Sequence, residues 1–118
     1  MKIQENIAVV AGGGSGMGAA VCRYLAEQGA KVVIIDQNEN AAAQLANETR
    51  GIAIACDISK SEDLTKAFEK IAQSHVRPIS IAVNCAGIAP AKRMVSKDGP
   101  MDLAFFEHVV NVNLVGTF

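Results

Sequence analysis

Four short apolar runs, each rich in isoleucine and valine, recur along the chain with room for a helix between one run and the next. They cover residues 7–11, 31–35, 52–56 and 79–83. Runs of this length and composition are typical of parallel strands that are covered on both faces. Because strands and helices alternate with short connections, the sequence predicts an α/β fold. We expect an incomplete, doubly wound parallel sheet of the Rossmann type, with about four strands, flanking helices and right-handed crossovers.

The segments between these runs have the length and period of helices. Gly29 lies where a glycine commonly ends a helix, after the segment that follows the first run. Residues 59–62, Ser-Lys-Ser-Glu, have the spacing of a capping box, which predicts that the third helix begins there. A loop over residues 90–101 then precedes a last helix, which we expect over residues 102–118.

The size and composition of the chain indicate one globular domain. A chain of 118 residues can bury roughly two thirds of the surface that its unfolded form exposes. Hydrophobic residues make up 50% and charged residues 19%, and both fractions are ordinary for globular proteins. No apolar run approaches the about 20 residues that a transmembrane helix requires, and residues 1–6 are too few and too polar for a secretory signal. We therefore expect a soluble, cytoplasmic protein with no membrane partner.

Neither charge nor metal-binding side chains gather into a recognisable site. The formal net charge is -1 and the charges are scattered, which disfavours nucleic-acid binding. Cys22, Cys56 and Cys85 include no Cys-x-x-Cys pair, so we expect reduced, buried thiols rather than disulfides or a zinc site. His75 and His108 lack metal-ligand spacing, and we expect them at a helix end and on a helix surface.

A glycine-rich turn follows the first apolar run. Residues 14–19, Gly-Ser-Gly-Met-Gly-Ala, match the pattern G-x-G-x-x-[GA]. Such a turn between a strand and a helix brings backbone N–H groups and the positive end of the helix dipole against a phosphate. The pattern alone is weak, but Asp36 ends the second run, about 20 residues on, where the dinucleotide fingerprint has its ribose ligand. The alternative is a merely tight turn and a solvated carboxylate at a strand end.

The residue types around Asp36 favour NAD over NADP as the cofactor. A carboxylate accepts hydrogen bonds from both hydroxyls of the adenosine ribose, and it repels a 2'-phosphate. Neither Gln37 nor Ser15 supplies a cation that would compensate this repulsion. The sequence therefore predicts an NAD site.

A second reading of the glycine-rich turn resembles the short-chain dehydrogenases/reductases, whose motif is G-x-x-x-G-x-G. Here the glycines are Gly12, Gly16 and Gly18, and Ala11 replaces the threonine that the family usually has before them. Three later segments resemble family motifs in the family's order: Asp57, then residues 84–87 (Asn-Cys-Ala-Gly), then residues 113–118 (Asn-Leu-Val-Gly-Thr-Phe). The amino-acid sequences of the later segments are most similar to those of the type II 3-hydroxyacyl-CoA dehydrogenase branch. The resemblance covers the whole chain but only the N-terminal half of the family's domain, its dinucleotide-binding part.

The resemblance implies a role for each matching position. Positions that would hold the pyrophosphate are Gly12, Ser15, Gly16, Met17 and Gly18. Asp36 would bind the adenosine ribose, and Asp57 with Ile58 would bind the adenine. Positions along the nicotinamide-side ribose would be Asn84, Ala86 and Gly87. Asn113 resembles the asparagine of the Asn-Ser-Tyr-Lys catalytic tetrad, whose family role is to bend the helix and hold a water of the proton relay.

The remaining members of that tetrad have no counterpart in this chain. The single tyrosine, Tyr24, is followed four residues later by Gln28 instead of lysine, so a helix-surface role is favoured for it. The resemblance therefore places the catalytic Ser, Tyr and Lys beyond Phe118. Loss of a general acid/base costs about 10²- to 10⁴-fold in rate, so we expect this chain alone to be a poor catalyst. It would be a truncated reading frame, a proteolytic product or a deliberate cut.

The resemblance implies that a longer parent interconverts a secondary alcohol and a ketone with NAD, with a 3-hydroxyacyl-CoA as one candidate substrate. The last helix commonly packs against a neighbouring subunit in the family, so a homo-oligomer is expected. Lys92, Arg93 and Lys97 are candidates for contact with CoA phosphates, and the alternative for them is a set of exposed loop cations. Cys85 is expected to be a packed side chain rather than a nucleophile. The alternative function is a non-catalytic nucleotide-binding or scaffolding module.

Overall fold

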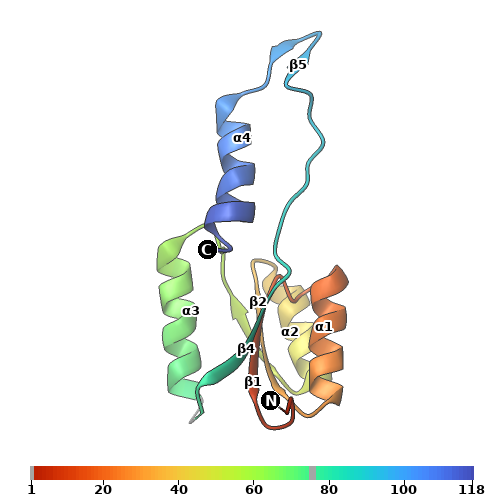
Figure 1. Cartoon of the computed structure of the whole chain (residues 1–118), viewed down its shortest axis with the longest axis vertical. Coiled ribbons are helices and arrows are strands. Elements are labelled where there is room, and N and C mark those ends of the chain that lie inside the picture. Colours follow the sequence, from red (N-terminus) through yellow and green to blue (C-terminus); the bar gives the residue numbers. More distant parts are fainter. Residues whose placement is uncertain (1, 75–76) are drawn as a thin grey trace.

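The computed structural model describes residues 2–74 and 77–118, and Figure 1 shows their arrangement. The expectation for His75 falls outside the described residues. The elements follow one another as β1 (Ile7–Ala11), α1 (Gly16–Glu27), β2 (Lys31–Asp36), α2 (Glu39–Thr49), β3 (Ile52–Ala55), α3 (Ser61–Ser74), β4 (Ile79–Asn84), β5 (Val95–Ser96), β6 (Gly99–Pro100), α4 (Leu103–Val110) and a π-helix, η1 (Asn111–Val115). This order confirms the predicted alternation of strands and helices.

The four long strands form one parallel sheet in the order β3-β2-β1-β4. In Figure 1, α1 and α2 lie on one face of this sheet and α3 lies on the other. Neighbouring residues of a strand therefore serve opposite layers: Val10 packs with α1 and α2, and Val9 packs with α3. Burial of each such side chain contributes about 1.5–3 kcal/mol to folding. The predicted fold class, an incomplete Rossmann-type sheet with flanking helices, is confirmed.

Strand β4 differs from the central strands in its burial. It pairs in parallel with β1, and the described residues offer no second partner strand on its other side. Its side chains range from half-buried to exposed, whereas Val33 and Ile34 of β2 are completely buried. Ile79, at the start of β4, is 36% exposed. The described sheet thus has a partly apolar open edge at β4.

The predicted capping box at residues 59–62 is wrong in detail. Helix α3 begins at Ser61, and the Ser59 hydroxyl donates to Asp57 Oδ1 at 2.7 Å. The backbone N–H of Ser59 donates to the same oxygen at 3.0 Å. Hydrogen bonds to an ionised acceptor are strong, and both donors of Ser59 bind the Asp57 carboxylate, so this serine belongs to the turn before α3.

The segment between β4 and α4 extends away from the sheet as an arm, which we define as residues 89–102. Its outer end holds the antiparallel pair β5–β6, an element that the sequence did not predict. Figure 1 shows the arm reaching the far end of the molecule and α4 returning from it toward the sheet. The longest dimension is 54 Å, against 28 and 26 Å for the others. The Lys92 ammonium lies 4.6 Å from the centroid of the Phe105 ring, which connects the arm to α4.

The last helix is less regular than predicted. A continuous helix over residues 102–118 was expected, but α4 ends at Val110 and the wider π-helix η1 continues to Val115. The N–H of Gly116 donates to the carbonyl of Asn111 at 2.8 Å, one residue further back than in an α-helix. In the described part of the chain, no helix has the length and apolar character that a membrane crossing needs.

Candidate functional site

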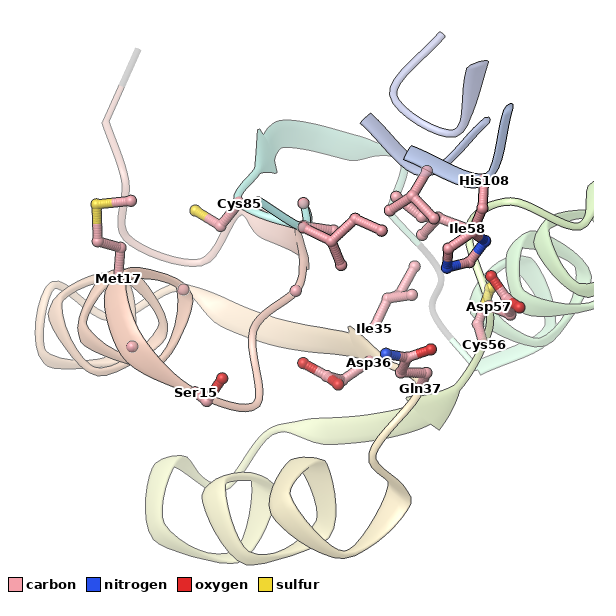
Figure 2. Close-up of a pocket in the computed structure, with 17 residues that line it drawn as sticks. Ser15, Met17, Ile35, Asp36, Gln37, Cys56, Asp57, Ile58, Cys85 and His108 are labelled. Atoms are coloured by element: carbon pink, nitrogen blue, oxygen red, sulfur yellow. The ribbon is translucent and has the colours of Figure 1, made fainter. Parts of the chain in front are cut away.

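A pocket of about 320 Å³ lies at the edge of the sheet where the parallel strands end (Figure 2). Parallel strands bring their carboxyl ends to one edge, and the segments that leave them diverge there around a crevice. The residues that line the pocket come from the loop after β1, the ends of β2 and β3, the segment after β4, and the last helix: Gly12, Ser15, Gly16, Met17, Gly18, Ile35, Asp36, Gln37, Cys56, Asp57, Ile58, Cys85, Ala86, Gly87, Ile88, His108 and Val112.

The loop after β1 needs its glycines for its own packing. A Cβ on Gly12 would lie 2.5 Å from the backbone nitrogen of Ala86, and a Cβ on Gly18 would collide with the carbonyl of Gly12. Gly12 and Gly16 also have φ angles of 71° and 52°, which disfavour any residue with a side chain. At Gly12 the loop therefore meets the backbone of the segment after β4 with no room for a side chain.

The same loop leaves the start of α1 open to an anion. Ser15 is the N-cap of α1, but its side chain makes no capping hydrogen bond, and the first turn of the helix contains no acidic residue. The first N–H groups of a helix lack partners within the helix and carry partial positive charge. This end of α1 lines the pocket at Gly16, Met17 and Gly18, so it can hold a phosphate there.

Asp36 stands at the end of β2 with both carboxylate oxygens occupied by backbone donors. Oδ2 accepts the N–H of Gly14 at 2.9 Å, and Oδ1 accepts the N–H of Asn38 at 2.9 Å. Each oxygen keeps acceptor capacity for a further donor. Gln37 beside it is neutral, and the described residues that line the pocket include no lysine or arginine.

Asp57 occupies the neighbouring position at the end of β3. Hydrogen bonds from the Ser59 hydroxyl and backbone N–H lower the pKa of the Asp57 carboxyl, and the positive charge of Lys60, with its ammonium 3.8 Å from Oδ2, acts in the same direction. The carboxyl is therefore ionised and able to accept hydrogen bonds at neutral pH. Asp63 of α3 accepts the backbone N–H of Asp57 at 3.2 Å and so ties this corner to the helix.

His108 reaches the same end of the pocket from α4. It is exposed on its helix, as predicted, yet it also lines the pocket beside Ile58 and Asp57 in Figure 2. Its charge contributes to lowering the pKa of Asp57. A place for His108 at the pocket was not predicted from the sequence, although its spacing four residues before Val112 puts both residues on one face of a helix.

The segment after β4 forms a further wall of the pocket. Cys85, Ala86 and Gly87 line it, whereas Asn84 ends the strand as an exposed residue outside the lining. The three cysteines are free, but only Cys22 and Cys56 are buried as expected, and Cys85 is half-buried at the pocket wall. Burial raises the pKa of the Cys22 thiol to about 11 and raises that of Cys56, so both are protonated.

Asn113 joins the last helix to this wall. Its Oδ1 accepts the N–H of Ile88 at 2.8 Å, and its Nδ2 donates to the carbonyl of Ile88 at 2.7 Å. A Cβ on Gly87 would lie 3.2 Å from Oδ1, so this position has little room for a side chain. Asn113 stands within η1, where the helix widens, and it lies outside the pocket lining.

Other candidates lie away from the pocket. Tyr24 is 56% exposed on α1, and Lys92, Arg93 and Lys97 stand on the arm; none of the four lines the pocket. Within residues 2–74 and 77–118, no three His, Cys, Asp or Glu side chains lie close enough together to hold a metal ion. The structure thus gathers ten of the eleven residues predicted to bind the cofactor at one pocket, and Asn84 alone of that set lies outside its lining.

Comparisons with known proteins agree with this architecture. A profile of the short chain dehydrogenase family matches residues 6–118. The 3-hydroxyacyl-CoA dehydrogenase type-2 of Bos taurus is 35% identical over 121 residues, which cover 99% of this chain and 46% of that protein. The mitochondrial borneol dehydrogenase of Lavandula x intermedia is 31% identical over 117 residues, which cover 99% of this chain and 44% of that protein.

A solved structure adds a comparison in three dimensions. The 3-ketoacyl-(acyl-carrier-protein) reductase from Brucella melitensis, complexed with NADH, matches with a TM-score of 0.85 at 30% identity, over 98% of this chain and 47% of that chain. The chain spans about half the length of the curated relatives described above. The names of these relatives differ in substrate and share an oxidoreductase class. With a family profile that covers nearly all of the sequence, the chain belongs to the short-chain dehydrogenase family.

Proposed function

We propose that this chain is the NAD-binding part of an oxidoreductase that interconverts a secondary alcohol and a ketone. The observation that carries the proposal is the pocket itself, where the open start of α1 and the carboxylates of Asp36 and Asp57 face one space. These groups match the phosphate, ribose and adenine parts of a dinucleotide. When bound, the nicotinamide supplies the hydride chemistry, and the protein supplies orientation.

Each group of the pocket has one task in this proposal. The loop from Gly12 to Gly18, with Ser15, Gly16 and Met17, holds the pyrophosphate on backbone N–H groups. Asp36 accepts the ribose hydroxyls, Asp57 and Ile58 meet the adenine, and the nicotinamide-side ribose lies along Asn84, Ala86 and Gly87. Asn113 fixes the wall that carries Gly87, since both polar atoms of its amide bind the backbone of Ile88.

The preference for NAD over NADP rests on charge. A 2'-phosphate next to Asp36 would lie against the negative charge of its carboxylate. Like charges in close contact repel strongly in a partly buried site. The described pocket lining offers no lysine or arginine to offset this repulsion. We therefore propose NAD as the cofactor, with NADP bound much more weakly.

The catalytic step belongs to a longer protein in this proposal. A serine, a tyrosine and a lysine outside this chain would complete the tetrad with Asn113 and handle the hydroxyl proton. The similarity to 3-hydroxyacyl-CoA dehydrogenases supports a 3-hydroxyacyl-CoA substrate, with Lys92, Arg93 and Lys97 of the arm as candidate phosphate contacts. We further propose a cytoplasmic homo-oligomer, and little or no turnover by the 118-residue chain alone.

The second candidate function is a non-catalytic nucleotide-binding or scaffolding module. The open edge of β4 favours it, as does the exposed apolar surface of the last helix, where Phe106 is 58% and Leu114 is 68% exposed. Such surfaces commonly mark contact with another protein. This candidate predicts NAD binding or a defined oligomer without any turnover in a longer form.

Calorimetric titration of the 118-residue chain with NAD tests the cofactor assignment. We expect saturable binding, and about 10- to 100-fold weaker binding for Asp36→Ala, because hydrogen bonds to a charged group contribute about 1.5–3 kcal/mol. The Arg23→Gln variant, on the exposed side of α1, serves as the control with unchanged affinity. Equal affinity of Asp36→Ala and the parent chain would contradict the assignment. Assays of a longer form of the protein with NADH and acetoacetyl-CoA then distinguish the two candidate functions. The oxidoreductase should oxidise NADH in this assay, and the non-catalytic module should not.

A further inference from the structure

Gly14 differs from every other glycine of the loop after β1. Gly12 and Gly16 have positive φ angles, and a Cβ on Gly18 would collide with the loop backbone. A Cβ on Gly13 would lie 2.9 Å from Ile34 Cγ2 and 3.0 Å from the Cys22 sulfur, inside the core. Gly14 has no positive φ, and the atoms that its Cβ would meet belong to the side chain of one pocket residue, Asp36.

The contact between Gly14 and Asp36 is close and directional. An ideal Cβ on Gly14 would lie 2.8 Å from Asp36 Oδ2, 3.0 Å from Cγ and 3.3 Å from Cβ. At the same time the N–H of Gly14 donates to Oδ2 at 2.9 Å. The absence of a side chain at this position therefore lets the carboxylate rest directly on the loop backbone.

A second donor fixes the other oxygen of the same carboxylate. The N–H of Asn38 donates to Oδ1 at 2.9 Å, and Asn38 is itself held as the N-cap of α2 by the N–H of Ala41 at 3.1 Å. One donor from the loop and one from the start of α2 thus hold the two oxygens. Hydrogen bonds to an ionised acceptor are strong and directional, so this pair of donors restricts how the carboxylate can turn.

We propose that Gly14 is a specificity-determining position of the nucleotide pocket, which acts by fixing the Asp36 carboxylate where it recognises the 2'-hydroxyl of the adenosine ribose. This inference rests on the proposed NAD site. Gly14 is a positioning residue: it needs no contact with the nucleotide, and its effect passes through Asp36. A fixed acceptor discriminates a ribose from a deoxyribose better than a mobile one, because no freedom is lost when the hydroxyl binds.

The same geometry predicts that Gly14→Ala leaves the fold intact. The methyl group would displace a carboxylate at the free end of a short side chain, and no backbone atom has to move. Alanine at an ordinary φ also restricts the unfolded chain, which favours the folded state. We expect a melting temperature equal to or slightly above that of the parent chain, together with altered ribose recognition.

Calorimetric Kd values for NAD and for its analogue with a 2'-deoxy adenosine ribose test the proposal. For the parent chain we expect the analogue to bind about 10-fold more weakly, as for the loss of one hydrogen bond to a charged group. In Gly14→Ala this ratio should fall to about 2, with NAD affinity lowered and analogue affinity nearly unchanged. A purely structural role would weaken both ligands by the same factor.

A double-mutant cycle shows whether the effect passes through Asp36. Asp36→Ala and Gly14→Ala/Asp36→Ala should have the same NAD affinity and the same ratio, because the added methyl has no carboxylate left to displace. Gly13→Ala is the matched control: it should lower the melting temperature through its core contacts and keep the ratio of the parent chain. If Gly13→Ala does not fold, the parent chain and the double variant still provide the comparison.

The outcomes separate this inference from the function on which it rests. If the parent chain shows no saturable NAD binding, the proposed function is overturned, and this inference with it. If the parent chain binds NAD and Asp36→Ala weakens it, but Gly14→Ala keeps the 10-fold ratio, only the role of Gly14 is overturned. Additive losses in the double variant would overturn it as well, because Gly14 would then act independently of Asp36.

Discussion

The part of the chain up to Ser74 and the part from Arg77 onward are held in place by different means. Every residue of the described hydrophobic core lies between Ile7 and Ile71, within β1, β2, β3 and the three helices around them or, for Ala30 and Cys56, directly beside a strand. Strand β4, the arm, α4 and η1 contribute no buried residue. The first part is a packed sandwich, and the second is attached to it by the β1–β4 ladder and a few directional contacts.

The difference matters because the pocket lies where the two parts meet. Its floor, from the glycine loop to Asp57, stands on the core, whereas the wall after β4 depends on the two hydrogen bonds between Asn113 and Ile88. Packed interiors are stiff and respond to the loss of single methylene groups. A wall held by a few hydrogen bonds opens at a much lower free energy. We therefore expect the global stability to depend on the first part, and local opening at the pocket wall to depend on the second.

The largest effect should come from a cavity in the first part. Ile34 is fully buried in β2, so Ile34→Ala should lower the free energy of unfolding by about 2–5 kcal/mol. Leu114→Ala removes a side chain that is 68% exposed and should change it by no more than about 0.5 kcal/mol. Urea unfolding followed by circular dichroism measures both. Similar losses for the two variants would show that the last helix is packed in solution and would break the comparison.

A smaller effect should follow when the junction itself is cut. Asn113→Ala removes both hydrogen bonds to Ile88 and should cost about 1–2 kcal/mol of local stability, since each such bond is worth about 1 kcal/mol. Hydrogen exchange should become faster at the amide of Ile88 and remain unchanged in β2. Asn111→Ala, two residues earlier on the same exposed helix, is the matched control. Faster exchange throughout the sheet would mean that the two parts unfold together.

The fold of the first part was predictable because burial of apolar side chains on both faces of the sheet determines most of it. Its strands are recognisable as apolar runs and its loop as a cluster of glycines. A parallel sheet with helices on both faces buries all of those runs. The ends of β2 and β3 follow from that arrangement, so the sequence alone was enough to assign Asp36 and Asp57 to one edge of the sheet. The ends of the apolar runs mark the carboxyl ends of the strands, and the residues at these ends form the floor of the pocket.

The second part was predicted less well for a physical reason. Its contacts are individual interactions between residues distant in the sequence, such as Asn113 with Ile88 and Lys92 with Phe105. No periodic pattern in the sequence predicts such contacts. The π-helix needs one extra residue in a turn, which the apolar spacing of residues 103–114 does not show. His108 was assigned to a helix surface, and its place at the pocket depends on how the arm returns α4 to the sheet.

The free energy of unfolding at acidic pH tests one polar contact of the first part, between Ser59 and Asp57. The Ser59 hydroxyl lowers the pKa of Asp57 from its ordinary value of 3.8. A carboxyl with a lowered folded pKa stabilises the fold above its unfolded pKa, and this stabilisation is lost as the pH falls through the folded pKa. Ser59→Ala should therefore cost about 0.5–1 kcal/mol at pH 7, and the difference should shrink below about pH 4.

Urea midpoints between pH 7 and pH 2.5 measure this profile. Ser74→Ala is the control, because the Ser74 hydroxyl donates to the neutral carbonyl of Lys70 at 2.7 Å and its loss should be independent of pH. A Ser59→Ala difference that stays constant down to pH 2.5 would show that the hydroxyl does not act through the ionised Asp57.

The most local effect should come from the contact that attaches the arm to α4. Lys92→Gln removes the cation above the Phe105 ring, which is 4.6 Å from its centroid, and an exposed contact of this kind contributes about 0.5–1 kcal/mol. Hydrogen exchange should become faster over the outer arm, residues 93–101, and stay unchanged in β1 and β2, because the core does not depend on the arm. Lys97→Gln removes an equal charge from the β5–β6 turn and should leave the exchange rates as they are. If both variants loosen the arm equally, net charge rather than the ring contact holds it. If neither does, the β5–β6 pair keeps the arm in shape without the contact between Lys92 and Phe105.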